Sequence, residues 1–240
     1  MAVMAAAPAL ADPVILNGGF EMVTPAKSTE FGTLYAGQVV SNWTSSGYNF
    51  VFLPGTADTS GASNQYNQQL KLWGPGIKDV NGNSLSNNGL PASSPVGGNF
   101  IAADGAYLAG PIQQKITGLS PNSVVQISFY YAGAQQYGFD GVTTEGWRVS
   151  LGNETHDTVI LTNDSHGFTG WRQATLSFVV TSAAETLSFL ALGTPSGAPP
   201  FTLLDGVSIT QVPEPGSLGL VGAVLGAIGV MTRRRKRMAA

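Results

Sequence analysis

Residues 124–132 read VVQISFYYA, and this stretch shows most clearly which class of fold the chain adopts. It is rich in β-branched and aromatic residues, and apolar positions partly alternate with polar ones, which is typical of a half-buried β-strand. Four other stretches share these properties and predict further strands: 147–151 (WRVSL), 174–180 (ATLSFVV), 186–192 (TLSFLAL) and 202–209 (TLLDGVSI). Because no helical pattern separates them, the sequence predicts an all-β fold, an antiparallel β-sandwich.

Turn-forming residues occupy the gaps between these predicted strands. The segment 54–99 differs from the rest, because Asn, Gly, Ser and Gln crowd it. We expect long polar loops here, at one edge of the sandwich, around a short strand at 70–73. The segment 12–211 is long enough to form one β-sandwich domain with a substantial core.

The composition narrows the classes of partner. The chain has no cysteine, which excludes disulfides and thiolate metal sites. Five of its 11 Lys and Arg residues lie at 233–237, so residues 12–212 carry six cations against 13 acids, a formal charge of −7. We expect no nucleic-acid partner for such an acidic surface.

The C-terminal segment, residues 212–240, has three parts in a fixed order. Pro213, Glu214 and Pro215 come first, an apolar glycine-rich run covers 218–231, and a basic cluster covers 233–237. As a helix, the apolar run would extend about 21 Å, less than the roughly 30 Å of a bilayer core, which favours a transient transmembrane helix over a permanent anchor. The alternative is a buried C-terminal helix, but core helices seldom end in consecutive cations.

This order resembles the PEP-CTERM sorting signal of Gram-negative bacteria. The resemblance implies export, transient attachment to the inner membrane through the C-terminal hydrophobic helix, and processing by an exosortase-type membrane enzyme. The protein would then reside in the cell envelope or outside the cell. The sorting residues would be Pro213, Glu214 and Pro215, together with the basic residues Arg233, Arg234 and Arg235.

The N-terminus agrees with export. Residues 9–11 (Ala-Leu-Ala) form a small-x-small cleavage pattern after an apolar stretch, so residues 1–11 are interpreted as the remnant of a signal peptide. A frayed N-terminus is the alternative for so short a segment.

A second resemblance covers most of 12–209. Residues 17–21 (NGGFE), Trp43, residues 113–121 (QQKITGLSP) and residues 204–208 (LDGVS) follow the order found in galactose-binding-like jelly rolls, including carbohydrate-binding modules. In such modules the two ends of the domain lie side by side and often hold structural calcium. The resemblance therefore implies a Ca²⁺ site at Glu21 and Asp205, with the remaining oxygens from carbonyls and water. The alternative is that both carboxylates only accept hydrogen bonds from turn amides.

Sugar recognition combines exposed aromatic rings with polar side chains that bond hydroxyl groups. The candidate ligand-binding residues are Tyr66, Trp73, Tyr137, Asp140 and Trp147, which lie in or near stretches rich in Asn and Gln. For each tryptophan the competing interpretation is a place in the core.

The sequence shows no recognisable arrangement of catalytic residues. His156 and His166 are the two histidines, and carboxylate pairs such as Asp140 with Glu145 occur in any acidic β-protein. The sequence predicts a non-catalytic exported protein that associates with extracellular polysaccharide. Two alternatives stay open: a secreted carbohydrate-active enzyme, and a structural matrix or biofilm protein without a sugar ligand.

Overall fold

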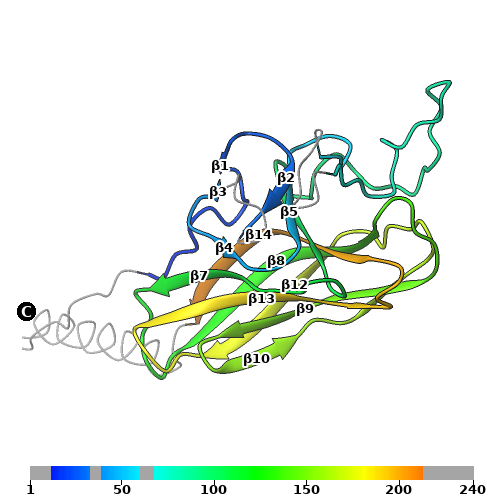
Figure 1. Ribbon diagram of the computed structural model, residues 1–240. Coiled ribbons are helices and arrows are strands. Elements are labelled where there is room, and N and C mark those ends of the chain that lie inside the picture. Colours follow the sequence, from blue (N-terminus) through cyan, green and yellow to red (C-terminus); the bar gives the residue numbers. More distant parts are fainter. Residues whose placement is uncertain (1–11, 33–38, 60–67, 213–240) are drawn as a thin grey trace, which may run out of the picture.

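The computed structural model describes residues 12–32, 39–59 and 68–212, and all regular structure in these ranges is β (Figure 1). The strands are β1 (Val23–Thr24), β2 (Thr29–Phe31), β3 (Val39–Val40), β4 (Thr44–Ser45), β5 (Asn49–Phe52), β6 (Phe100–Asp104), β7 (Ile112–Thr117), β8 (Val124–Gln135), β9 (Thr143–Leu151), β10 (Glu154–Asp157), β11 (Leu161–Asn163), β12 (Arg172–Val179), β13 (Ala184–Thr194) and β14 (Pro200–Val212). All five strands predicted from composition are present, and each agrees with its predicted range to within a few residues, apart from longer ends on β8, β9 and β14.

Two six-stranded antiparallel sheets stack face to face, which confirms the predicted sandwich (Figure 1). One sheet has the order β12-β8-β14-β6-β5-β2, and we call it the central sheet because it contains the longest strands. The other follows β10-β9-β13-β7-β4, with β11 also paired to β9. A small ribbon of β1 and β3 lies at the side.

The main core fills the space between the sheets. Alternate residues of each strand point into it, as period-two strands require. Phe129 and Phe189 meet edge to face with ring centroids 5.1 Å apart, and Trp147 meets Phe189 at 5.9 Å. Such perpendicular aromatic contacts fit the quadrupoles of the rings, and the Phe129–Phe189 contact joins the two sheets.

A second apolar cluster lies on the opposite face of the central sheet. Phe50, Phe52, Phe100 and Phe201 belong to it, together with Leu72 from the polar loop segment. The strands β5 and β6 are therefore buried on both faces, which explains their continuous apolar runs. The described parts of the 54–99 loops are the cover that makes this possible, and Figure 1 shows them in cyan and teal beside the sandwich.

The predicted strand at 70–73 is reduced to isolated bridges, Asp58 with Lys71 and Leu72 with Gln136. The segment is extended because Leu70 and Leu72 both insert into the second cluster. This insertion does not require a long ladder of backbone hydrogen bonds to a neighbouring strand. The described parts of 54–99 are mostly loops. The predicted strand at 70–73 was too long, because only residues 71 and 72 form bridges.

Several predictions fall outside the described residues: the signal-peptide remnant 1–11, Tyr66, and the sorting segment from Pro213 onward with its helix. Among the described residues, none forms a helix long and apolar enough to cross a membrane.

Candidate functional site

A cavity of about 270 Å³ opens where three strands of the sandwich begin or end. The strand β6 ends there at Asp104, β8 ends at Gln135, and β14 begins at Pro200. The register brings them together, since Phe201 pairs with both Asp104 and Ala134. We call this cavity the β6-end pocket. It is lined by Tyr48, Gln68, Asp104, Tyr107, Gln136, Phe139, Ser196 and Pro199.

Asp104 is the acidic group among these lining residues, and it is only 1% exposed. One carboxylate oxygen, Oδ1, accepts hydrogen bonds from the backbone N–H groups of Ala106 (2.8 Å) and Tyr107 (2.9 Å). The other, Oδ2, is buried and has no hydrogen-bond partner among the residues that the structure describes. Burial raises the pKa of Asp104 to about 6, although the two backbone hydrogen bonds act in the opposite direction. At neutral pH the pocket therefore holds a mostly ionised carboxylate whose second oxygen is unused.

Three aromatic side chains, Tyr48, Tyr107 and Phe139, line the same pocket as this carboxylate. Tyr48 is anchored in the second cluster, where it meets Phe50 edge to face at 4.7 Å. Tyr107 stands perpendicular to Tyr48 at 5.4 Å and is 40% exposed. Phe139, on the loop after β8, is 37% exposed. A buried ring that supports an exposed ring is a rigid arrangement, because the inner ring has no room to turn.

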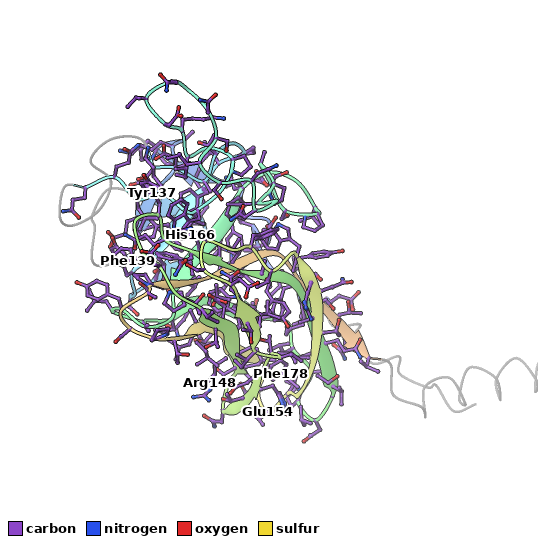
Figure 2. All side chains as sticks on the ribbon, turned by 90° about the vertical axis from the view of Figure 1, so that its right-hand side faces the viewer. Tyr137, Phe139, Arg148, Glu154, His166 and Phe178 are labelled. Atoms are coloured by element: carbon purple, nitrogen blue, oxygen red, sulfur yellow. The ribbon has the colours of Figure 1, made fainter. Side chains whose placement is uncertain are left out.

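The loop that carries Phe139 is anchored by three neighbouring rings, those of Trp73, Tyr137 and His166, which we call the aromatic brace. The indole N–H of Trp73 donates to the carbonyl of Phe139 at 3.0 Å. Trp73 stacks on His166 with centroids 3.8 Å apart and meets Tyr137 edge to face at 4.7 Å. His166 in turn bonds Asp140 through Nε2 at 2.5 Å. Figure 2 shows Tyr137, Phe139 and His166 together at one end of the molecule, with Arg148 and Glu154 toward the other end.

Three of the predicted ligand residues, Trp73, Tyr137 and Asp140, are thus brought together, but as the brace behind the pocket wall and not as its lining. Tyr66 lies outside the described residues. The prediction for Trp147 was wrong, because this side chain is 0% exposed in the main core and its N–H donates to the carbonyl of Leu203. A β-strand within a sandwich buries every second residue, and Trp147 occupies an inward position.

Sequence reasoning missed the four residues that dominate the lining: Tyr48, Asp104, Tyr107 and Phe139. A signal did exist, because residues 100–107 (FIAADGAY) place an acid and an aromatic directly after an apolar strand. What the sequence did not contain was the register that joins this strand end to Tyr48 and Phe139.

Glu21 and Asp205, which form the second predicted site, lie close together. The N-terminal segment lies against the end of the domain, where the Val207 N–H donates to the Gly18 carbonyl at 2.9 Å. A Cβ on Gly19 would stand 3.7 Å from Oε1 of Glu21 and 3.8 Å from Oδ1 of Asp205, so the two carboxylates border one small space. Burial raises the pKa of Asp205 to about 7, and the charge of Glu21 adds to the effect.

Both carboxylates of this pair also accept hydrogen bonds. Ser94 donates its hydroxyl to Asp205 Oδ2, and the N–H of Gly206 donates to Oδ1 at 2.6 Å. Glu21 accepts from the Asn99 N–H at 2.9 Å. No group of three or more His, Cys, Asp or Glu side chains suited to a metal occurs in the described part of the chain, so any ion here would depend on carbonyl or water oxygens.

The carboxylate pair Asp140 and Glu145 does not face a shared cleft. Glu145 is fully buried between the sheets, where Thr143 donates to its Oε1, and burial raises its pKa to about 8. Asp140, in contrast, has a side chain that is 84% exposed. A larger hollow of about 510 Å³ among the 54–99 loops is lined mainly by glycine, proline and alanine, with Lys78 as its charged group.

Comparison with protein families gives one match: residues 211–236 match the PEP-CTERM protein-sorting motif. The resemblance seen in the tail is confirmed, and the chain carries the sorting signal of an exported protein. The matched stretch begins at Gln211, inside β14. A comparison with curated proteins finds no match.

Among solved structures, the chain is similar to a carbohydrate-binding module described as CBM4 (TM-score 0.35, 14% identity, 82% of this chain and 99% of that chain). It is also similar to the CBM22-1 xylan-binding domain of Paenibacillus barcinonensis Xyn10C (TM-score 0.35, 13% identity, 78% and 94%). A third similar structure is the enzymatically active domain of tailspike protein 4 from bacteriophage CBA120 (TM-score 0.36, 13% identity), where 82% of this chain matches only 21% of that chain.

Proposed function

We propose that this is an exported, non-catalytic protein that binds extracellular polysaccharide through the β6-end pocket. One observation supports the proposal above the others: Asp104, whose buried Oδ2 has no partner among the described residues, lines the same pocket as Tyr48, Tyr107 and Phe139. Sugars present hydroxyl donors on their edges and C–H groups on their faces, so they match a carboxylate and aromatic rings at the same time. Gln68, Gln136 and Ser196 supply further polar groups.

The position of the pocket fits a protein sorted by its C-terminus. The strand β14 begins beside the pocket at Pro200 and ends at Val212, directly before the Pro213-Glu214-Pro215 motif. Thirteen residues of strand extend roughly 40 Å. While the tail engages the membrane and its exosortase, the pocket would therefore face away from the membrane. After processing, the domain would remain in the envelope or outside the cell.

A glycan array with residues 12–212 tests the binding. Tyr107→Ala removes the exposed ring and is expected to weaken binding of any captured glycan at least tenfold, whereas Tyr107→Phe keeps the ring and should retain most of it. Both variants should remain folded, because Tyr107 lies at the surface and is 40% exposed. If no glycan binds the wild-type domain, the sugar-binding proposal is wrong and the matrix protein becomes the better account.

The sorting step has its own test. Replacing Glu214 by Ala, or Arg233 to Arg235 by Ser, should leave the sandwich folded but block maturation and change the location of the protein in a host with an exosortase. Normal processing of both variants would contradict the assignment of these residues.

We also propose structural Ca²⁺ between Glu21 and Asp205, since a cation would offset the repulsion that two adjacent carboxylates create. A chelator should then lower the melting temperature of the wild-type domain but not that of Glu21→Gln. Equal behaviour of the two proteins with and without chelator would leave hydrogen bonding as the role of both carboxylates.

The enzymatic alternative makes a different prediction. Hydrolysis of a glycosidic bond by the usual route needs two carboxyl groups across the bond, and one acidic side chain is found among the described residues that line the pocket. Incubation with a bound glycan should release no reducing ends. Release that disappears in Asp104→Asn would establish an enzyme instead.

A further inference from the structure

We infer that the β6-end pocket prefers a sugar unit that carries a protonated amine, such as a hexosamine without its acetyl group. The inference rests on the proposed sugar binding and names the ligand class of that same site. It follows from three observations: Oδ2 of Asp104 has no donor among the described residues, no cation faces this carboxylate among the described residues that line the pocket, and aromatic rings line the same pocket.

The first step concerns the free oxygen. Asp104 is 1% exposed, and one of its carboxylate oxygens has no partner in the described part of the chain. Burying an ionised carboxylate in this way costs free energy, and a ligand that supplies a donor recovers that cost. A neutral hydroxyl can donate one hydrogen bond. An ammonium group donates as well and also neutralises the charge, and charge-assisted hydrogen bonds are about twice as strong as neutral ones.

The second step concerns the charges nearby. No Lys or Arg occurs among the described residues that line the pocket. Lys71, in the adjoining loop, pairs with Asp58 at 3.2 Å, and His166 pairs with Asp140. The segment 60–67, which precedes the lining residue Gln68, reads SGASNQYN and contains no charged residue. The carboxylate of Asp104 thus lacks a cation of its own in this part of the chain.

The third step concerns the rings. Tyr48 and Tyr107 stand perpendicular at 5.4 Å, and Phe139 lines the same pocket. Aromatic faces attract cations through their quadrupoles, and this attraction strengthens when the cation is partly removed from water. The same rings that would stack on a sugar therefore also favour a positive substituent on it. A volume of about 270 Å³ suits a small part of a chain, such as one or two sugar units.

The test is a calorimetric titration at pH 7 with three β-1,4-linked oligosaccharides of equal length: glucosamine, N-acetylglucosamine and glucose. We expect the glucosamine oligomer to bind at least tenfold more tightly than the other two. Asp104→Asn should abolish this preference and leave similar, weaker affinities for all three. Asp157→Asn is the matched control, because it removes the same charge from the surface ion pair with Arg148, which lies toward the other end of the molecule (Figure 2).

The outcomes separate the two proposals. Equal affinity of the wild-type protein for all three oligosaccharides overturns the amine preference but leaves sugar binding in place. A preference that falls equally in Asp104→Asn and Asp157→Asn also overturns it, because general electrostatic attraction would then be the cause. Binding of none of the three, together with an empty glycan array, overturns the sugar-binding proposal itself.

Discussion

Asp104 and Asp205 invite comparison, because both are almost fully buried aspartates on neighbouring strands of the central sheet. Asp205 has a donor for each oxygen, Ser94 for Oδ2 and the Gly206 N–H for Oδ1. Among the described residues, Asp104 has donors for one oxygen, Oδ1. Burial raises the pKa of both groups, so neither burial nor pKa distinguishes them. The difference lies in the hydrogen-bond partners, and it supports the proposal that Asp205 is structural and Asp104 binds a ligand.

Their places in the chain explain this difference. Asp205 lies within β14 next to an irregularity in its pairing with β8, between Asp205 and Ser208, where the N-terminal segment and the loop with Ser94 both reach it. Asp104 is the last residue of β6, and the backbone turns away directly after it. A strand end offers donors from its own turn on one side and open space on the other.

The largest expected effect is a dependence of stability on pH. Asp104, Asp205 and Glu145 have pKa values raised by burial to about 6, 7 and 8. Between its ordinary pKa and its raised pKa, each group is ionised in the unfolded chain but protonated in the folded one, so the folded state loses stability as pH rises. We expect the free energy of unfolding to increase by at least about 2 kcal/mol when pH falls from 8 to 5.

Urea unfolding at four pH values in the presence of a chelator measures this dependence. The variant Glu145→Gln should show a flatter profile, because it removes the group with the highest raised pKa. A stability that decreases from pH 8 to pH 5 would show that the carboxylates are not desolvated as described.

The second effect contrasts the two aspartates directly. Asp205→Ala leaves the Ser94 hydroxyl and the Gly206 N–H without acceptors and should lower stability by about 1–3 kcal/mol. Asp104→Asn keeps an acceptor for the turn after β6 and should remain within about 1 kcal/mol of wild type. Urea unfolding at pH 7 checks both variants. Equal losses would remove the distinction between a structural and a ligand-binding aspartate.

A smaller difference in stability tests how Glu21 is held beside Asp205. Gly98 has a φ of +71°, and a Cβ there would stand 1.6 Å from Oε1 of Glu21, whereas Gly97 has a φ of +83° and no atom within 4 Å of such a Cβ. Both Gly→Ala changes cost backbone strain, about 1 kcal/mol, but Gly98→Ala must also displace Glu21 from Asn99 and should cost about 1 kcal/mol more. Thermal unfolding of the two variants gives the difference. If they lose the same stability, Glu21 is not held at Asn99.

Much of the fold was accessible from the sequence, because period-two patterns in 124–132 and 186–192 report directly which face of a strand is buried. The strands β5 and β6 were not predicted, since burial on both faces removes the alternation. Their cover comes from the polar loops, where Leu70 and Leu72 are apolar residues in a stretch that otherwise resembles solvent-exposed chain. The sequence therefore predicts the main core between the two sheets better than the second apolar cluster.

The candidate site was predictable only in part. Composition identified the loop aromatics, and Trp73 and Tyr137 do meet, but in the layer behind the lining. Trp147 shows why an aromatic near polar residues is ambiguous, because its neighbours in sequence point to the other face of the sheet. The candidate binding role of Asp104 depends on its pairing with Phe201 and on the approach of Tyr48. Both are long-range contacts, and no local sequence signal announces them.

The most direct test of the account is to map where a bound glycan touches the protein, by following backbone amide signals of labelled residues 12–212 in an NMR titration. The account predicts that the largest shifts occur at Ala106, Tyr107, Gln136 and Phe139, around the unpartnered oxygen of Asp104. The amides of Asn99 and Gly206, which bond Glu21 and Asp205, should stay unchanged. Shifts centred on those two amides, or on the exposed face of β9 and β13, would contradict the assignment of the β6-end pocket as the binding site.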